Sequence, residues 1–161
     1  MQNIFRPGLF KNHVAIVTGG GSGIGLSIAE SLGQLGAKVA ICGRNVERLE
    51  NGADSLRKKG IEVLHMVCDI RDKNQVETFV DSVKKGLGPA SVLINNAGGQ
   101  FPSKAEDITK NGFESVITNN LNGTFFMTQY VASQHMIPVK RGRIINITAN
   151  IKRGFPGMAH T

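Results

Sequence analysis

The stretch TGGGSGIG, from Thr18 to Gly25, joins a short apolar run to a segment with helical periodicity. The run that it ends, Val14 to Gly20, is continuous, rich in β-branched residues and closed by glycines, which is typical of a strand buried on both faces. Beyond the turn, apolar residues recur at helical spacing, at Ile24, Ile28, Leu32 and Leu35, and Gly36 ends the pattern. A glycine pattern that closes a strand and opens a helix predicts a nucleotide-binding turn.

The same alternation continues along the chain. Further strands are predicted over residues 38–42, 62–70, 91–98 and 142–148, with helices over residues 45–60 and 72–88 and a long helix from Thr109 to about His135. Strands that alternate with helices of this length indicate βαβ units, right-handed crossovers and a parallel sheet. We therefore expect an α/β fold with a doubly wound parallel sheet, Rossmann-like and three-layered, that is truncated after its fifth strand. Residues 1–161 are expected to be one dinucleotide-binding domain, the N-terminal part of a longer single-domain enzyme.

Composition narrows the classes of partner. The chain has 161 residues, 40% of them hydrophobic, and a formal charge of +7, which favours anionic ligands in general. The basic residues form no stripe with interleaved aromatics, so we expect no nucleic-acid partner. No apolar run approaches the length of a membrane helix and no signal peptide is evident, so a cytoplasmic protein without membrane contact is expected. Cys42 and Cys68 lie in apolar runs without ligand spacing, and we predict small buried residues and no metal site.

The turn predicts how a nucleotide would be held. Its glycines allow the phosphates to approach the main chain, and the start of the helix supplies unpaired N–H donors. The predicted cofactor-binding residues of this turn are Gly19, Gly21, Ser22, Gly23, Ile24 and Gly25. The second strand ends in CGRN, where Arg44 stands at the tip and no carboxylate is present. Because an arginine can pair with a 2′-phosphate, we expect the cofactor to be NADP(H).

Three further motifs follow in order: CDI at 68–70, NNAG at 95–98 and NNLNGTF at 119–125. Together with the glycine turn they resemble the short-chain dehydrogenase/reductase family over essentially the whole chain. The resemblance implies that Asp69 and Ile70 form the adenine pocket. It also implies that the NNAG motif lines the cofactor, through Asn96, Ala97 and Gly98. A catalytic role is implied for Asn120, which would distort the long helix and hold a water of the proton relay.

The family's chemistry is hydride transfer between a nicotinamide and a carbonyl or activated double bond, assisted by a Ser and a Tyr-x-x-x-Lys pair. In this chain the serine position falls on Thr148 or Ala149, and Thr148 retains a hydroxyl as a catalytic candidate. The family's tyrosine would fall at or near Thr161, where none is found. Tyr130, the sole tyrosine, is followed four residues later by Gln134 and is predicted to be a packing residue. We therefore expect the 161-residue chain alone to be inactive.

The segments NNAGGQF and ANIKRGFPGMAHT are similar to the branch that contains the 2,4-dienoyl-CoA and trans-2-enoyl-CoA reductases. This resemblance implies hydride transfer to an unsaturated fatty acyl-CoA, with the enolate stabilised by hydrogen bonds from candidates Gln100, Thr148 and Asn150. The alternatives are a 3-oxoacyl thioester or other carbonyl reductase of the same family, and a non-catalytic NADP(H)-binding fragment. A homo-oligomer is expected at full length, and poor solubility for residues 1–161 in isolation.

Overall fold

The computed structural model describes residues 4–149, 157, 159 and 160. Five parallel strands form one sheet in the order β3-β2-β1-β4-β5. The strands are β1 (Val14–Thr18), β2 (Lys38–Gly43), β3 (Val63–Val67), β4 (Val92–Asn95) and β5 (Arg143–Asn146). The predicted doubly wound α/β fold is confirmed, because the chain winds outward from β1 in both directions.

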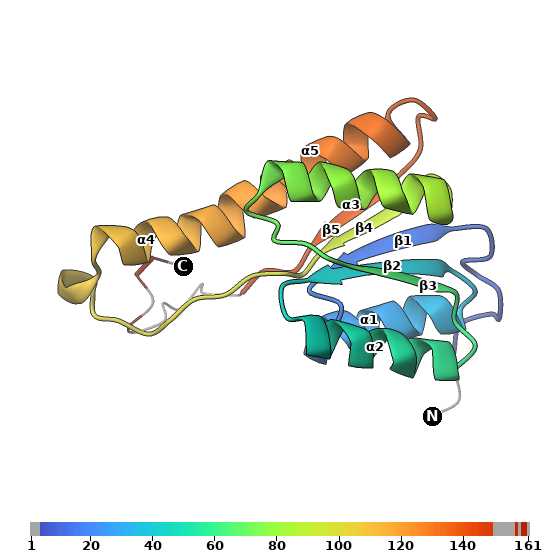
Figure 1. The fold of residues 1–161 in the computed structure, drawn as a ribbon, viewed down its shortest axis with the longest axis horizontal. Coiled ribbons are helices and arrows are strands. Elements are labelled where there is room, and N and C mark those ends of the chain that lie inside the picture. The colour runs from blue at the N-terminus through green and yellow to red at the C-terminus, as the bar shows by residue number, and fades with distance from the viewer. Residues whose placement is uncertain (1–3, 150–156, 158, 161) are drawn as a thin grey trace.

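Helices cover the sheet in two layers (Figure 1). Helices α1 (Gly23–Gln34) and α2 (Val46–Lys58) lie on one face, and α3 (Lys73–Gly86) and α5 (Gly123–Val131) lie on the other. Each face has its own core. The first core includes Val17, Ala29, Val39, Ile41, Leu49 and Leu56. The second includes Ile16, Cys42, Phe79, Val80, Leu93 and Met127. Alternate residues of the buried strands therefore serve opposite cores, as the period of two in a strand requires.

The helix boundaries follow local signals in the sequence. Asn45 caps α2 through its side-chain oxygen, which accepts from the backbone N–H of Arg48 at 2.8 Å. Asp72 caps α3 in the same way, accepting from Asn74 at 2.9 Å. Gly36 and Gly60, which follow α1 and α2, have φ angles of +100° and +73°. Left-handed backbone of this kind ends a helix at little cost only where the residue is glycine.

The long helix differs from the prediction of one continuous α-helix. The structure divides it into α4 (Lys110–Ile117), a π-helical turn η2 (Thr118–Asn122), α5, and a second π-helical turn η3 (Ala132–Met136). A short 3₁₀ turn, η1 (Ala105–Asp107), precedes them. A π turn accommodates an extra residue in the helix and occurs often at functional sites. The motif NNLN falls within η2, so the predicted distortion of the helix is found where Asn120 lies.

Strand β5 lies at one edge of the sheet and leaves apolar side chains exposed. The exposed fractions of Ile145 and Ile147 are 49% and 43%. Both line an apolar groove of about 360 Å³ with Arg143 and, from α1, β4 and the N-terminal segment, with Phe10, Ile28, Leu32, Val92 and Ile94. Among the described residues, no helix covers this groove. None of the helices in this part of the chain has both the length and the apolar character needed to cross a membrane.

Candidate functional site

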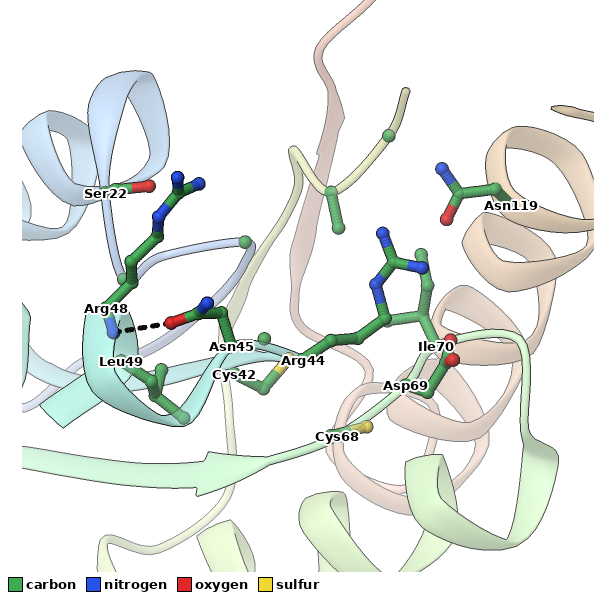
Figure 2. A pocket seen from close by; sticks show the side chains of 15 residues that line it. Ser22, Cys42, Arg44, Asn45, Arg48, Leu49, Cys68, Asp69, Ile70 and Asn119 are labelled. Carbon is green, nitrogen blue, oxygen red and sulfur yellow. Dashed lines mark hydrogen bonds between the residues drawn. The ribbon is translucent and has the colours of Figure 1, made fainter. Parts of the chain in front are cut away.

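A cavity of about 510 Å³ opens at the carboxyl ends of the strands. Its walls come from the β1–α1 turn, the ends of β2, β3 and β4, the first turn of α2, and η2 (Figure 2). Strand order reverses at β1, since β2 and then β3 lie on one side of it and β4 on the other. In open parallel sheets, ligands bind at such a switch point, outside the carboxyl ends of the strands.

The glycine turn is packed so closely that side chains are excluded. A Cβ on Gly25 would lie 2.4 Å from the carbonyl oxygen of Gly19 and 2.5 Å from the Nδ2 atom of Asn96. Gly19 and Gly23 have φ angles of +65° and +55°, which favour glycine. Ser22 stands at the N-cap of α1, but its side chain makes no capping hydrogen bond. The turn therefore presents a serine hydroxyl and the first N–H groups of α1 at the edge of the cavity.

Thr18 connects this turn to the end of β4. Its hydroxyl oxygen accepts hydrogen bonds from the backbone N–H groups of Asn96 at 3.0 Å and Ala97 at 2.9 Å. The side-chain amide of Asn96 donates back to the carbonyl oxygen of Thr18 at 2.9 Å. These bonds hold two walls of the cavity together. The contribution of Thr18 was not predicted, because a threonine at the end of a strand has no sequence signal that separates it from an ordinary strand residue.

The carboxylate of Asp69 is engaged by Arg71. The Nε atom of Arg71 donates to both carboxylate oxygens of Asp69, at 2.9 and 3.0 Å, and Nη2 completes the pair. These bonds to Arg71 hold the pKa of Asp69 below its usual value, against the opposing effect of burial, and the charge of Arg44 acts in the same direction. Asp69 is thus an oriented, ionised acceptor at the end of β3.

Two arginines lie on this cavity, and they extend in different directions. Figure 2 shows Arg44 extending toward Asp69, Ile70 and Asn119, whereas Arg48 extends toward Ser22. Arg44 was predicted from the sequence as a cofactor-binding residue, and Arg48 was not. The available signal was its position, one helical turn after Arg44 and at the start of a capped helix, which places both side chains near the end of β2.

Cys42 and Cys68 lie at the floor of the cavity and are buried, as predicted. A hydrogen bond with Cys68, followed by burial, raises the pKa of the Cys42 thiol well above its usual value. Both cysteines are free. A thiol with a raised pKa stays protonated and is a poor nucleophile, so these residues act here as small packing groups.

Asn120 lies in η2, across from the loop that follows β4. Its Oδ1 atom accepts from the backbone N–H of Gly99 at 2.9 Å and from the Nδ2 atom of Asn119 at 3.3 Å. A Cβ on Gly98 would lie 3.2 Å from the same oxygen. The π turn and the NNAG loop therefore approach each other closely enough that Asn120 orders the loop.

The predicted site residues fall into three groups. The cavity is lined by Gly19, Gly21, Ser22, Arg44, Asp69, Ile70, Ala97 and Gly98. The glycine turn depends on three others: Gly23 through its left-handed backbone, Gly25 through its close contacts, and Asn96 through its hydrogen bond to Thr18. Ile24 is 66% exposed on the outer face of α1, away from this cavity.

The remaining catalytic candidates are not gathered at the cavity. Thr148 is exposed beyond β5 and does not line it. Gln100 lines a smaller cavity of about 200 Å³, together with Arg44, Arg71 and Asn119. Asn150 and Thr161 lie outside the described residues.

Tyr130 has the environment of a packing residue. Its side chain packs against the core under α3 and α5, and its hydroxyl donates to Asp81 at 3.3 Å. Burial, and then the charge of Asp81, raise the pKa of Tyr130 above its usual value. A catalytic base of this type would need a lowered pKa instead.

Residues 13–160 match the family model described as short chain dehydrogenase. Over 155 residues the chain is 39% identical to a Streptomyces violaceoruber protein named as ketoacyl reductase 1 of the granaticin polyketide synthase, covering 96% of this chain and 56% of that protein. It is 34% identical over 159 residues to a peroxisomal 2,4-dienoyl-CoA reductase of Arabidopsis thaliana, covering 94% of this chain and 53% of that protein. The chain thus spans about half the length of these curated relatives.

Solved structures show the same fold. A citronellol catabolism dehydrogenase of Pseudomonas aeruginosa PAO1 superimposes with a TM-score of 0.92 at 42% identity, covering 99% of this chain and 65% of that chain. An actinorhodin polyketide ketoreductase with NADPH gives a TM-score of 0.89 at 36% identity, covering 92% of this chain and 57% of that one. An NAD⁺-bound xylitol dehydrogenase gives 0.90 at 36% identity, covering 94% and 59%.

Proposed function

Since the chain belongs to the short-chain dehydrogenase family, we propose that it is the NADP(H)-binding part of an oxidoreductase that reduces an unsaturated fatty acyl-CoA. One observation carries the cofactor assignment. The cavity at the strand ends combines a glycine turn with two arginines, Arg44 directly after β2 and Arg48 in the first turn of α2. A dinucleotide with an additional phosphate fits this combination of backbone donors and cations.

The preference for NADP(H) over NAD(H) rests on charge at the ribose position. In NAD-binding members of this fold class, a carboxylate near the end of the second strand accepts from the ribose 2′-hydroxyl. Among the described residues that line the cavity, the one carboxylate is that of Asp69, which follows β3 and is paired with Arg71. One structural neighbour has NADPH and another is bound to NAD⁺. The choice between NADP(H) and NAD(H) therefore rests on the residues of this chain.

The bound cofactor would supply a hydride at its nicotinamide. The chain's own residues would hold the nucleotide and order the loops. The glycine turn would hold the phosphates against the first N–H groups of α1, and Asp69 and Ile70, which line the same cavity, would contact the adenine ring. Asn120 orders the loop after β4 by accepting from the N–H of Gly99, and under this proposal it would also hold a water of the proton relay.

The substrate class is supported by the 2,4-dienoyl-CoA reductase of Arabidopsis thaliana and by the net positive charge of the chain, which suits a phosphate-bearing thioester. A second candidate is reduction of a 3-oxoacyl thioester or another carbonyl compound. The 39% identity to the granaticin ketoacyl reductase favours this alternative as much as the first.

The proposed function also implies how residues 1–161 relate to the whole enzyme. Residues 1–161 form the dinucleotide-binding part of a longer single-domain enzyme that acts as a homo-oligomer in the cytoplasm. The share of the relatives that the chain covers, 53% to 56%, supports the first statement. The 161-residue chain alone would then bind NADP(H) without catalysing turnover. The alternative of a non-catalytic NADP(H)-binding fragment makes the same prediction.

Two experiments test the proposal. Calorimetric titration of the purified protein should give tighter binding of NADPH than of NADH; equal affinities would contradict the assignment of NADP(H). In the full-length protein, oxidation of NADPH should be followed with a 2-enoyl-CoA, a 2,4-dienoyl-CoA and a 3-oxoacyl thioester at matched chain length. Turnover of the first two supports the enoyl-CoA assignment, and turnover of the third alone supports the carbonyl alternative.

A further inference from the structure

Exposed cations and exposed aliphatic side chains gather at the end of the molecule opposite the cavity. They come from the last turn of α3 and from residues 137–141, which follow η3 and precede β5. These residues lie where strands begin, whereas the cavity opens where strands end. Figure 1 shows the orange turn between η3 and β5 protruding past the end of α3. The basic patch, as we call it, consists of Lys84, Lys85, Ile137, Val139, Lys140 and Arg141.

Side-chain contacts join the two segments of the basic patch. The Nζ atom of Lys84 donates to the carbonyl oxygen of Gln134 in η3 at 3.1 Å. The Nη2 atom of Arg141 lies 3.5 Å from the Nε2 atom of His13, and Nδ1 of the same ring lies 2.8 Å from the Ser91 hydroxyl oxygen. The patch is thus attached to the segments that enter β1 and β4, and its members lie together on one surface.

The aliphatic members are exposed by an ordered turn. The backbone N–H of Lys140 donates to the carbonyl oxygen of Ile137, and that of Arg141 donates to the carbonyl oxygen of Met136, both at 3.1 Å. Lys140 has a φ angle of +49°, a left-handed conformation that residues other than glycine rarely adopt. The exposed fractions of Ile137 and Val139 are 67% and 58%. Two large apolar side chains are therefore held in solvent by a defined turn.

The basic patch has an excess of positive charge. Within the described part of the chain, none of its four cations forms an ion pair with a carboxylate. Asp81, the acidic residue nearest to Lys84 along α3, accepts a hydrogen bond from Tyr130. Cations stabilise the end of a helix, which explains Lys84 and Lys85. This effect does not explain the exposed aliphatic side chains beside them.

We propose that the basic patch docks the protein on an anionic lipid surface, with Ile137 and Val139 entering the headgroup region. Clustered lysines and arginines are attracted to an anionic leaflet, and exposed apolar side chains add affinity in proportion to the area that they bury. A nucleic-acid partner would be favoured by interleaved aromatic side chains, and the patch has none. Such a peripheral contact requires no membrane-spanning helix. It leaves the cavity open to solution and does not depend on the proposed function.

The test measures the binding of the full-length protein to lipid vesicles by sedimentation. Vesicles of phosphatidylcholine alone are compared with vesicles that also contain about 30% phosphatidylserine, at low and at high salt. Retention on heparin, a soluble polyanion without an apolar phase, is measured in parallel. The proteins are wild type, Lys140→Gln/Arg141→Gln, Ile137→Ser/Val139→Ser and the control Lys104→Gln/Lys110→Gln. The control removes two exposed cations near α4, outside the patch, and so has the same net charge as the first variant.

Wild type should bind the anionic vesicles at least about tenfold more tightly than the neutral ones, and high salt should remove most of this difference. Lys140→Gln/Arg141→Gln should weaken binding to the anionic vesicles about tenfold, because each cation near the surface contributes to affinity. Ile137→Ser/Val139→Ser should weaken it about fivefold and leave retention on heparin unchanged. The control should stay within about twofold of wild type. Thermal unfolding of each variant verifies that the fold is kept.

Wild-type binding to anionic vesicles that is no tighter than to neutral ones would overturn the proposal. Full vesicle binding by Ile137→Ser/Val139→Ser would also overturn it, because the patch would then be a site for soluble polyanions or acidic proteins. An equal loss in the control and in Lys140→Gln/Arg141→Gln would assign the effect to net charge, again against the proposal. None of these results bears on NADP(H) binding, which the calorimetric titration tests separately.

Discussion

Thr18 and Asn96 hold each other by two hydrogen bonds of opposite direction. The backbone N–H of Asn96 donates to the Thr18 hydroxyl at 3.0 Å, and the Asn96 side-chain amide donates to the Thr18 carbonyl oxygen at 2.9 Å. The two residues are 78 positions apart in the chain, at the ends of β1 and β4. The pair therefore closes the sheet at the point where the cavity begins, and the glycine turn and the NNAG loop cannot move independently.

Replacing Thr18 by Val keeps the shape of the side chain and removes the acceptor for two backbone N–H groups. Each unsatisfied group costs about 1–3 kcal/mol when buried, so Thr18→Val should lower the free energy of unfolding by about 2–4 kcal/mol. Thr18→Ser, which retains the hydroxyl, is the control and should lose much less. Urea denaturation measures both. Equal stabilities of the two variants would show that the hydroxyl contributes little.

Gly25→Ala should disrupt the glycine turn. The added Cβ would lie 2.4 Å from the carbonyl oxygen of Gly19, a backbone atom that can move only with the whole turn. Overpacking of this kind costs about 1–3 kcal/mol. Gly43→Ala is the matched control, since a Cβ there meets nothing within 4 Å. The midpoint of thermal unfolding should fall for Gly25→Ala alone.

His135 should make the stability of the fold depend on pH. Its ring is buried and its Nδ1 atom accepts from the backbone N–H of Ala90 at 2.7 Å, so the folded state requires the neutral ring. Burial, and next the charge of Lys84 on α3, lower the pKa of His135 below 6.5, and Asp81 opposes them only in part. The unfolded chain consequently binds the proton more tightly than the folded chain does.

This difference between the folded-state and unfolded-state pKa of His135 determines how the free energy of unfolding changes with pH. Stability contributed by the neutral ring is complete above pH 6.5 and is lost as the pH falls from there through the lower folded-state pKa. The free energy of unfolding of wild type should therefore decrease from pH 7.5 to pH 5. His135→Gln should show a shallower decrease. Parallel profiles for the two proteins would exclude His135 as the cause.

Gly52→Ala distinguishes a packing constraint from helix propensity. Alanine in place of glycine within an exposed helix stabilises it by about 1 kcal/mol. At Gly52 the added Cβ would lie 3.0 Å from the Cα atom of Gly21, so α2 should instead be displaced from the glycine turn. The variant should bind adenosine 2′,5′-bisphosphate several-fold more weakly than wild type, and Asn51→Ala on the exposed side of α2 should bind it normally. Unchanged affinity with raised stability would show that the contact is loose.

The apolar groove beside β5 predicts self-association of residues 1–161 expressed alone. Ile145 and Ile147 are 49% and 43% exposed and adjoin apolar side chains of α1 and β4. Exposed contiguous apolar surface favours aggregation. Static light scattering should show species larger than the monomer mass of 17.3 kDa, and Ile145→Lys should reduce them more than Ile137→Lys, which lies outside the groove. A monodisperse wild-type monomer would contradict the prediction.

The order of strands and helices could be predicted because each buried parallel strand is a continuous apolar run and each helix has a polar face. Strand ends were less predictable. The predicted strand over 91–98 ends in the structure at Asn95, whose side chain donates across to Asn146 of β5 and to Thr128 of α5. The chain leaves the sheet there because the next residues bond to Thr18 instead, a contact between distant segments that local pattern does not encode.

The site was predictable where a motif specifies backbone shape. The glycine turn is of this kind, since a left-handed backbone restricts the residue type. Arg48 and Thr18 depend on packing between elements, and their residue types occur equally well at ordinary surface and strand positions. The π turns could not be predicted from periodicity either, because the buried residues on both sides of η2, Val116, Met127 and Val131, keep ordinary helical spacing in the sequence.

The π-helical turn η2 constrains the number of residues in this segment as well as their kind. An α-helix advances by about 100° per residue, so one extra residue in a turn offsets everything that follows by roughly that angle. Met127 and Val131 of α5, which follow η2, are fully buried against the second core, and Asn120 within η2 accepts from the backbone N–H of Gly99. Deleting a single residue between Val116 and Met127 would leave an amphipathic sequence, yet it would turn the buried face of α5 toward solvent. Length is therefore a determinant of this helix, and substitutions there should be better tolerated than insertions or deletions.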